Sequence, residues 1–365
     1  MERIKEIELE IARTQKNKST NQHICLLKAR LSKLRRQLQQ PASKGSQDHQ
    51  GFDVSKSGVA RIGFIGFPSV GKSTLMSKLT NTHSEVADYE FTTLTTIPGI
   101  LTYNNAKIQI LDLPGIIEGA KDGRGRGKQV LGVARTCSMI VIVLDATKPL
   151  AHKKVIEKEV YGFGIRINKE KPQIKFIKKT TGGIFIRYAK DKSGISADLQ
   201  NIDVVKSILH EYKINNGELR ITSGDVDDLI DAIENNRIYL SCIFAINKID
   251  ELTINELDVL SRIENSVFIS SKFLWNIDNF LISVWKYLDL IRIYPKPKNK
   301  PIDEPVVLKR GKTKVEDFCN CIHKTIIKKL KHCIVWGNSV KYSPMKVGKD
   351  HELGDGDVIQ IVKRI

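Results

Sequence analysis

The stretch Gly66-Phe67-Pro68-Ser69-Val70-Gly71-Lys72-Ser73 decides the fold. It fits the pattern G-x-x-x-x-G-K-S/T, and it lies between the apolar run Arg61–Gly66 and Thr74-Leu75, where a helix is expected to begin. Glycines let backbone N–H groups curl around phosphates, and a helix N-terminus adds its dipole. Lys72 would reach the β- and γ-phosphates, and the Ser73 hydroxyl would ligate Mg²⁺. The stretch therefore predicts a nucleotide-binding loop between a strand and a helix.

Short apolar runs, mostly β-branched, predict further strands that are buried on both faces of a parallel sheet. The five runs are Arg61–Gly66, Lys107–Leu111, Met139–Leu144, Leu240–Ile246 and Val267–Ser270. Most are separated by helix-compatible segments, which favours a doubly wound α/β domain. The gap between the third and fourth runs is far longer than the roughly twelve residues that a crossover needs. We therefore expect an inserted α+β subdomain at about 150–236, including a glycine-turned hairpin at Thr180–Ile186.

The two ends of the chain have a different pattern. Residues 2–39 carry two apolar stripes at helical spacing, which predict a helical hairpin, and a Pro/Ser/Gly linker follows at Pro41–Gly51. After Leu290 comes a Pro/Lys-rich segment, and then short apolar runs around a helix-like Val315–Lys331 predict a small α+β unit. The expected domains are thus residues 1–50, 51–290 and 291–365.

Charge is concentrated at these ends. Of the net +18, residues 1–50 carry +6 (11 Lys/Arg against 5 Asp/Glu) and residues 291–365 carry +9 (17 against 8), whereas the 240 residues between them carry only +3. Basic ends beside a nearly neutral centre favour a polyanionic partner such as ribosomal or other structured RNA. The alternative is that the charge only keeps the protein in solution.

Other classes of protein fit the sequence poorly. No apolar run approaches the roughly 18 residues that span a bilayer, so we expect no membrane insertion. The first ten residues contain four glutamates and no apolar segment behind them, which argues against a secretory or transit peptide. The six cysteines form no C-x-x-C pair, and reduced thiols in a cytoplasmic protein are the simplest interpretation. Cys319, Cys321, His323 and Cys333 have the wrong spacing for zinc, so a packed helix is favoured over a metal site.

The base is indicated by Asn247-Lys248-Ile249-Asp250, which follows the run Leu240–Ile246. A carboxylate such as Asp250 can accept hydrogen bonds from both N1–H and the exocyclic amine of guanine, and adenine has no matching pair of donors. Ser270-Ser271-Lys272, at the end of the next strand, can complete the base pocket; a plain serine-rich turn is the alternative. The pattern therefore disfavours an ATP-dependent enzyme.

Two further segments predict a switch that responds to the γ-phosphate. Asp112-Leu113-Pro114-Gly115 ends a strand, so Asp112 would hold Mg²⁺ through water and the Gly115 N–H would sense the γ-phosphate. Thr93, with Thr92 as the fallback, would supply the second hydroxyl ligand of Mg²⁺. Loops of this kind become ordered around a γ-phosphate and are released after hydrolysis. Lys72, Thr93 and Gly115 are thus the expected catalytic residues.

Several strings in this sequence are similar to those of one family. They are GFPSVGKSTL at 66–75, YEFTTLTTIPGI at 89–100, DLPGIIEGAKDGRGRG at 112–127, NKID at 247–250 and DVIQIVKR at 357–364. Together they resemble the developmentally regulated GTP-binding proteins, the DRG family of the Obg group of GTPases. The resemblance covers essentially the whole chain, and VEDFC at 315–319 and VGKDH at 347–351 favour the first of the two eukaryotic subfamilies.

The resemblance implies a four-part protein: an N-terminal helix-turn-helix, a P-loop GTPase domain, an inserted subdomain of the ribosomal-S5 domain-2-like type and a C-terminal TGS domain of β-grasp shape. It also implies GTP and GDP as ligands, Mg²⁺, and ribosome association in translation in the cytoplasm. The implied partner is the DRG family regulatory protein, so the chain would be a monomer or a heterodimer. The resemblance also implies K⁺ as an activating monovalent cation; many K⁺-stimulated relatives carry Asn where this chain has Ser69, which argues only mildly against it, so potassium activation stays an open expectation. Ser271 likewise replaces a commoner Ala.

Two functions remain open at this point: a GTP-hydrolysing switch in translation, and a nucleotide-gated scaffold for RNA or protein in which hydrolysis is incidental. Ile116 bears on the choice, because many GTPases have a glutamine here that orients the attacking water. An isoleucine has no polar group for that task, so intrinsic hydrolysis is expected to be slow.

We expect Ile116→Ala to leave intrinsic GTP hydrolysis within a few-fold of the unchanged protein, because the side chain contributes no polar group to the reaction. Lys72→Ala and Ser73→Ala should abolish turnover. Phosphate release under single-turnover conditions, measured in potassium and in sodium buffers, would check both expectations. A loss of several hundred-fold in Ile116→Ala with GTP affinity intact would contradict the passive role of residue 116.

Overall fold

The computed structural model describes residues 2–17, 20–39, 58–83, 99–113, 133–297 and 300–363. These residues form two compact units. Of the described residues, the first unit comprises 2–17, 20–39 and 158–239, and the second comprises 58–83, 99–113, 133–157, 240–297 and 300–363. Among the described residues, no helix is both long and apolar enough to cross a bilayer.

The second unit is built on a sheet with the strand order β10-β9-β4-β1-β3-β2. Its strands are β1 (Ala60–Gly66), β2 (Gly99–Tyr103), β3 (Ala106–Asp112), β4 (Met139–Asp145), β9 (Ile238–Asn247) and β10 (Ser266–Phe268). Along this path all neighbours are parallel except β2, which pairs antiparallel with β3; β5 (Ile165–Ile167) also pairs with β9, off the path. All five predicted strands are present, and β2 is an additional edge strand. The sequence analysis missed β2 because only one of its five residues is fully buried, so it lacks the continuous apolar run of a central strand.

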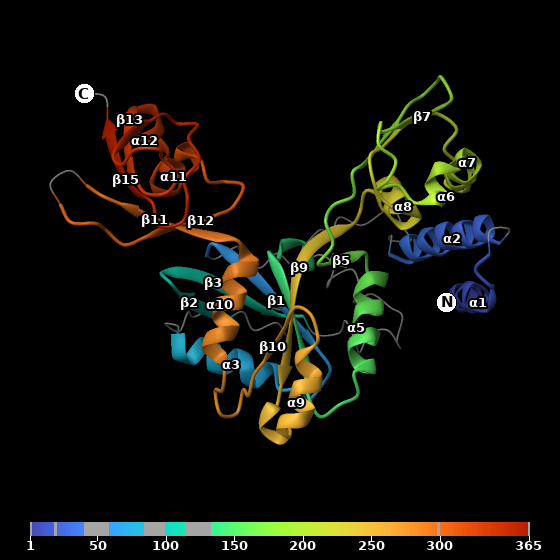
Figure 1. The fold of residues 1–365 in the computed structure, drawn as a ribbon, viewed down its shortest axis with the longest axis horizontal. Coiled ribbons are helices and arrows are strands. Elements are labelled where there is room, and N and C mark those ends of the chain that lie inside the picture. Colours follow the sequence, from blue (N-terminus) through green and yellow to red (C-terminus); the bar gives the residue numbers. More distant parts are fainter. Residues whose placement is uncertain are drawn as a thin grey trace, which may run out of the picture. The chain divides into compact units, whose positions relative to one another are not determined.

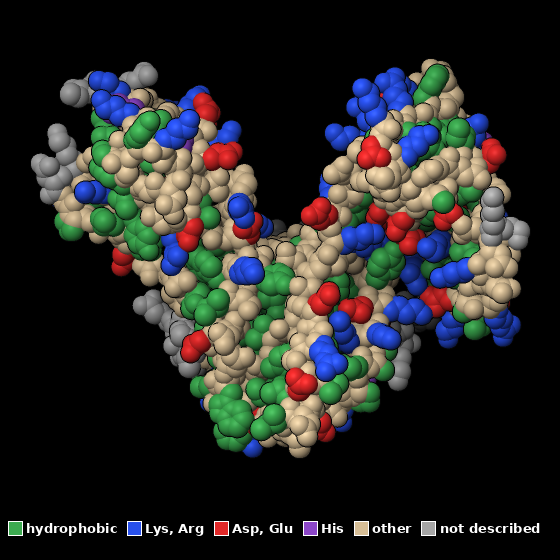
Figure 2. Space-filling model, in the orientation of Figure 1, with side chains coloured by type: hydrophobic (Ala, Val, Ile, Leu, Met, Phe, Trp, Pro, Cys, Tyr) green, Lys and Arg blue, Asp and Glu red, His purple; other side chains and the backbone are tan. Residues whose placement is uncertain are grey.

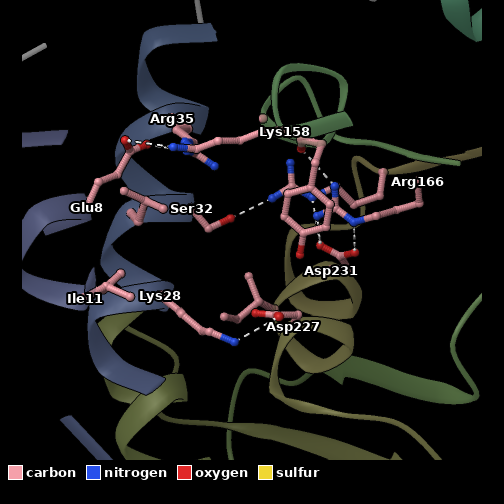
Figure 3. A pocket seen from close by; sticks show the side chains of 14 residues that line it. Glu8, Ile11, Lys28, Ser32, Arg35, Lys158, Arg166, Asp227 and Asp231 are labelled. Atoms are coloured by element: carbon pink, nitrogen blue, oxygen red, sulfur yellow. Dashed lines mark hydrogen bonds and ion pairs between the residues drawn. The ribbon is translucent and has the colours of Figure 1, made fainter. Parts of the chain in front are cut away.

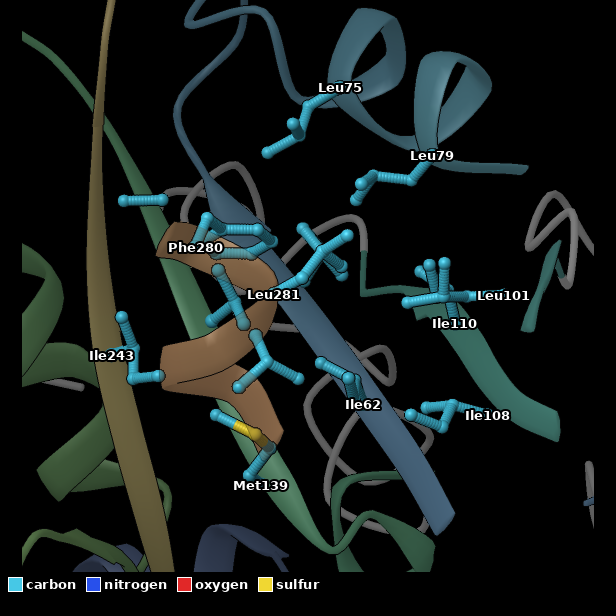
Figure 4. Close-up of a cluster of buried hydrophobic side chains, with 14 of the residues drawn as sticks. Ile62, Leu75, Leu79, Leu101, Ile108, Ile110, Met139, Ile243, Phe280 and Leu281 are labelled. Atoms are coloured by element: carbon cyan, nitrogen blue, oxygen red, sulfur yellow. The ribbon is translucent and has the colours of Figure 1, made fainter. Parts of the chain in front are cut away.

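Helices cover both faces of this sheet. Figure 1 shows α3 (Lys72–His83) and α10 (Ile277–Leu288) on one face and α5 (Ala151–Gly162) on the other, with α9 (Ile254–Ser261) near β10. Leu75 and Leu79 of α3 and Phe280 and Leu281 of α10 are each no more than 1% exposed and face Ile62, Met139 and Ile243 of the strands (Figure 4). Each such buried side chain stabilises the fold by roughly 1.5–3 kcal/mol. This packing fixes the carboxyl ends of β1, β3, β4 and β9.

The C-terminal residues of the second unit form a separate small sheet with the strand order β12-β11-β15-β13-β14. Its elements are β11 (Leu290–Pro295), β12 (Val306–Lys309), α11 (Val315–Ile322), α12 (Lys324–Lys328), β13 (Leu330–Trp336), β14 (Met345–Val347) and β15 (Val358–Lys363). Phe318 and Cys319 of α11 pack on Val335 and Ile359 of the sheet. The expected α+β unit is therefore present.

The predicted helix Val315–Lys331 is wrong in its extent. His323 has extended backbone angles (φ −167°, ψ 133°), so the helix is interrupted there, and β13 already begins at Leu330. The interruption lets Cys333 enter the core beside Cys319. Cys319 and Cys333 are buried in one apolar cluster, as packing predicts, whereas Cys321 is exposed.

The first unit combines the N-terminal helices with the segment that interrupts the α/β pattern. Its elements are α1 (Glu2–Arg13), α2 (Asn21–Gln39), β5 (Ile165–Ile167), β6 (Ile174–Lys178), β7 (Ile184–Tyr188), α6 (Ala197–Gln200), α7 (Ile202–Glu211), β8 (Gly217–Ile221) and α8 (Val226–Glu234). Cys25 and Ala29 of α2 belong to the same buried cluster as Val205 and Ile208 of α7. The expected helical hairpin is present, and its second helix shares a core with α7 and α8.

The predicted hairpin Thr180–Ile186 is wrong. Strands β6 and β7 flank the turn, but they do not pair with each other, because β8 lies between them in the order β6-β8-β7. Strand β8 pairs antiparallel with β6 and parallel with β7. Gly217, Leu219 and Ile221 of β8 are buried in the centre of the sheet. A partner some 30 residues later in the chain leaves no signal in the local glycine pattern.

A network of buried ion pairs joins α2 to α8 in this unit (Figure 3). Arg166 donates two hydrogen bonds of 2.7 Å to Asp231, and Arg237 lies 2.9 Å from the same carboxylate. Arg237 also contacts Glu234 at 2.7 Å and donates to the Ser32 hydroxyl of α2 at 2.6 Å. The Asp231 side chain is 1% exposed and that of Arg166 is 4% exposed. Such a pair is costly to break, because the partner that remains is a buried, uncompensated charge.

We expect Asp231→Ala to destabilise this unit by roughly 3–5 kcal/mol, because it leaves the Arg166 guanidinium group buried without its counter-charge and leaves Arg237 with Glu234 alone. Lys158→Ala is the control, since Lys158 is 72% exposed and lies 3.6 Å from Glu8 in the same unit. Its cost should be under about 1 kcal/mol. Native-state hydrogen exchange of the α7 and α8 amides measures both values. Equal protection in the two variants would show that the buried network contributes little.

Candidate functional site

The predicted phosphate loop lies between β1 and α3, as the sequence indicates. Strand β1 ends at Gly66, α3 begins at Lys72, and the Leu75 N–H donates to the Gly71 carbonyl at 2.9 Å to form the first helical turn. Ser69 (φ 65°) and Gly71 (φ 86°) have left-handed backbone angles, which turn the chain sharply between the two elements. Ser73 and Thr74 are exposed in the first turn of α3, at its positive end.

Position 71 requires glycine for two reasons: the left-handed backbone angle and the close approach of a neighbouring side chain. A Cβ atom at this position would lie 2.3 Å from Nδ2 of Asn247. At Gly66 a Cβ atom would lie 2.7 Å from the Val143 carbonyl oxygen of β4. Both glycines of the motif therefore allow close approach of the loop to adjacent strands.

Lys72 is placed beside the end of β3. Its Nζ lies 2.9 Å from Oδ1 of Asp112, and the two side chains are 14% and 22% exposed. The ammonium group is thus held at the mouth of the loop by a carboxylate from the neighbouring strand. Asp112 and the Ser73 hydroxyl are oxygen donors, the ligand type that Mg²⁺ prefers, so the residues present fit a magnesium ion that is also bound by phosphate oxygens.

Asn247 connects the phosphate loop to the segment after β10. Its Nδ2 donates to the Val70 carbonyl at 2.8 Å, and its Oδ1 accepts hydrogen bonds of 2.9 Å from both the N–H and the hydroxyl of Ser271. The side chain is 2% exposed. One buried amide therefore satisfies groups from two loops that are far apart in the sequence, and it holds them at a fixed separation.

Asp250 provides an acceptor with no partner of its own. It lies in a short 3₁₀ helix, Ile249–Glu251, directly after β9. Its Oδ1 is buried and has no hydrogen-bond partner among the described residues. Buried acceptors in proteins are nearly always satisfied, so an orphaned one indicates a ligand with a matching donor.

Lys248 is fixed by a residue that the sequence analysis did not select. Its backbone is left-handed (φ 67°), and its Nζ lies 2.7 Å from Oδ2 of Asp145 at the end of β4. The hydrogen bond to Asp145 raises the pKa of Lys248. Burial opposes ionisation of Asp145, but hydrogen bonds from Lys248 and Thr147 hold the pKa of this carboxyl below its usual value. The signal was available, because Asp145 directly follows the predicted strand Met139–Leu144, and in the structure it lies opposite Asn247 on the parallel neighbour.

Ser270, Ser271 and Lys272 lie in a tight turn after β10. Ser270 and Ser271 are buried, and the backbone N–H groups and carbonyls of Ser270 and Trp275 form a reciprocal pair at 3.2 Å. The Lys272 ammonium group lies 5.0 Å from the Phe273 ring centroid. The structure thus brings this turn, Asn247 and the phosphate loop together on one edge of the sheet.

Phe67 and Pro68 complete the described part of the loop. The Phe67 ring packs against His152 of α5, with ring centroids 4.6 Å apart. Thr92, Thr93, Pro114, Gly115 and Ile116 lie outside the described residues, as does the basic segment 121–128. The predicted roles of Thr93 and Gly115 therefore remain expectations from the sequence.

Three family models match consecutive parts of the chain after residue 60. The family described as 50S ribosome-binding GTPase matches residues 61–179, the C-terminal region of that domain matches residues 181–290, and the TGS domain matches residues 291–363.

Relatives cover the chain from end to end. Developmentally-regulated GTP-binding protein 1 of Xenopus laevis is 58% identical over 366 residues, covering 99% of this chain and 98% of that protein. Developmentally-regulated G-protein 3 of Arabidopsis thaliana is 55% identical over 370 residues, covering 100% and 99%. Ribosome-interacting GTPase 1 of Saccharomyces cerevisiae is 52% identical over 370 residues, also covering 100% and 99%. The chain therefore belongs to the developmentally regulated GTP-binding protein family, with a P-loop GTPase domain that binds guanine nucleotide and a C-terminal TGS domain.

Proposed function

We propose that this protein hydrolyses GTP at the described site and acts as a molecular switch in translation, on the ribosome and in the cytoplasm. The observation that carries the proposal is the arrangement of Asn247 and Asp250. Asn247 joins the phosphate loop to the base loop by hydrogen bonds, and Asp250 presents a buried acceptor with no partner among the described residues. That arrangement suits a guanine base held at a set distance from its phosphates.

The remaining site residues have roles that follow from where they lie. In the proposed complex, the backbone N–H groups of residues 66–74 other than Pro68 surround the phosphates, and Lys72 neutralises the β- and γ-oxygens. Lys248, Ser270, Ser271 and Lys272 line the base pocket. Mg²⁺ would be held by Ser73 and Thr93, with Asp112 acting through water, and it supplies charge neutralisation at the β- and γ-phosphates. The Gly115 N–H is assigned to the γ-phosphate. In the hydrolysis, a water oxygen forms a bond to the γ-phosphorus while the bond from the γ-phosphorus to the β–γ bridging oxygen breaks, and GDP, inorganic phosphate and a proton are released.

The ribosomal role is supported by the printed name of the yeast relative and by the basic ends of the chain. The structure refines which cations are available for RNA. On α2, Lys28 pairs with Asp227, Arg30 and Lys33 pair with Glu211, and Arg35 pairs with Glu8. These four charges stabilise the first unit internally. At the C-terminal end, Arg310 pairs with Asp289, and Lys309, Lys312 and Lys314 are exposed. We assign RNA contact mainly to that end, and we retain a regulatory protein of the DRG type as the proposed partner.

Guanine specificity is tested by Asp250→Asn. An amide at this position has one acceptor oxygen and one NH₂ donor in place of two acceptor oxygens, so the variant should lose affinity for GTP and prefer xanthosine triphosphate, whose C2 carbonyl accepts from that donor. Competition of the two nucleotides for a fluorescent analogue measures the preference. Glu251→Gln, one residue further on, is the matched control and should keep the preference for GTP. An unchanged preference in Asp250→Asn would show that the base pocket is assigned wrongly.

Switch function on the ribosome is tested by turnover. We expect slow intrinsic hydrolysis that purified ribosomes accelerate at least tenfold, and Lys72→Ala should abolish it under both conditions. Ribosome pelleting in GTP, in GDP and in a non-hydrolysable analogue measures nucleotide-dependent association. If association depends on the nucleotide but ribosomes leave turnover unchanged, the protein is a nucleotide-gated scaffold instead.

A further inference from the structure

The three-stranded sheet of the first unit has one face that packs on helices and one face that does not. Inward-facing Phe176, Ile184, Ile186 and Tyr188 pack against the cluster that includes α7 and α8. Residues at the alternate positions point the other way, because side chains alternate along a strand. No described element covers that outer face, which we call the outer sheet face. Its residues are Lys175, Ile177, Lys179, Phe185, Arg187, Glu218 and Arg220.

Cations form a row across the outer sheet face. Lys175 of β6 lies opposite Arg220 of β8, and Arg220 lies opposite Arg187 of β7. All three are exposed, and neighbouring strands are only about 4.8 Å apart. Like charges directly opposite one another destabilise a sheet. A polyanion bound across the strands would place negative charges beside these three cations and so offset their mutual repulsion.

The next row combines an acid with apolar groups. Ile177, Glu218 and Phe185 lie opposite one another, and Ile177 and Phe185 are 59% and 57% exposed. Glu218 is surrounded by cations: Lys179 at 3.0 Å, Arg187 at 3.5 Å and Arg220 at 3.9 Å. These contacts lower the pKa of Glu218, with the Lys179 hydrogen bond as the largest cause. One carboxylate cannot neutralise four basic side chains, so the outer sheet face keeps a net charge of +3.

Further basic groups extend the positive surface beyond these seven residues. Lys178, Lys190 and Lys192 are exposed near the same strands, and Figure 2 shows lysine and arginine side chains gathered over this part of the first unit with hydrophobic side chains beside them. An open sheet face with exposed aromatic and cationic side chains is suited to single-stranded RNA, because bases stack on aromatic rings while phosphates contact Lys and Arg.

We propose that the outer sheet face binds single-stranded RNA, with a base stacked on Phe185 and phosphates on Lys175, Arg187 and Arg220. The inference deepens the proposed function, since it rests on an RNA-containing target, and it adds a surface away from the basic ends. An acidic protein segment would match the charge, but its carboxylate side chains do not stack on the exposed phenyl ring of Phe185 as a nucleobase does. Single-stranded RNA accounts for both features.

The test uses the full chain and a fluorescein-labelled oligouridine of about 12 nucleotides, a length within the usual footprint of such surfaces. Fluorescence anisotropy at several potassium chloride concentrations gives affinity and its salt dependence. We expect Phe185→Ala to weaken binding about tenfold, from the loss of one stacked base. The triple change Lys175→Ala, Arg187→Ala and Arg220→Ala should reduce the slope of log affinity against log salt by about 2, because each phosphate contact contributes roughly 0.7 for single strands.

Matched controls separate the outer sheet face from overall charge. Lys154→Ala, Lys206→Ala and Lys286→Ala together remove three exposed helix charges, and Ile202→Ala removes a side chain that is 47% exposed on α7. Both controls should bind RNA within about twofold of the unchanged protein. Phe185→Leu keeps apolar volume but removes the ring, so it should behave as Phe185→Ala does, whereas Phe185→Tyr should retain binding. Circular dichroism confirms that each variant is folded.

Three results would overturn the proposal: equal losses in the sheet and control triples, tighter binding of polyglutamate than of RNA, or equal binding of duplex RNA with no effect of Phe185→Leu. The second result would identify an acidic protein partner. Ribosome-stimulated GTP turnover of the sheet triple is measured in parallel. Stimulation that persists while oligouridine binding is unaffected by the sheet triple would refute the outer sheet face as an RNA site and leave the ribosomal switch standing.

Discussion

The site depends on a single buried amide. Asn247 donates to the Val70 carbonyl and accepts from the backbone and hydroxyl of Ser271, so one side chain fixes the phosphate loop relative to the base loop. A buried amide is worth most when every donor and acceptor is satisfied, because an unpaired group in this environment costs roughly 1–3 kcal/mol. The same amide requires glycine at position 71, because a Cβ atom there would occupy the space of the Asn247 amide. Phosphate recognition and base recognition are therefore parts of one packed arrangement.

Much of this arrangement could be predicted because it is local or follows from parallel strands. The pattern 66–73 fixes a loop between a strand and a helix, and the carboxyl ends of neighbouring parallel strands meet at one edge. That logic places Asp112 beside Lys72, and it would also have placed Asp145 beside Lys248 had strand order been known. The two predictions that failed, the hairpin Thr180–Ile186 and the extent of the helix Val315–Lys331, depend on contacts with residues elsewhere in the chain. Pairing of β6 and β7 with β8, and the break at His323 that admits Cys333 to the core, leave no local pattern.

The N-terminal helices show why sequence charge alone is an incomplete guide to a binding surface. The first 50 residues carry an excess of six positive charges, yet four cations of α2 pair with acidic groups of the same unit. Cys25 and Ala29 on the same helix are buried with α7. Helix α2 is thus part of a folded core, and a truncation that removed it would expose apolar surface as well as delete charge. A charge that is already paired has less to gain from a polyanion.

The outer sheet face presents the opposite case. Lys175, Arg220 and Arg187 lie side by side on adjacent strands, and the Glu218 carboxylate is shared among Lys179, Arg187 and Arg220. Their mutual repulsion costs stability in the free protein, and the exposed Phe185 and Ile177 contribute nothing to the core. A sequence optimised for stability alone would alternate charges on such a face. The arrangement is consistent with a surface shaped by what it binds, and it places excess positive charge on the inserted segment, where residues 148–179 already carry ten Lys/Arg against three Glu.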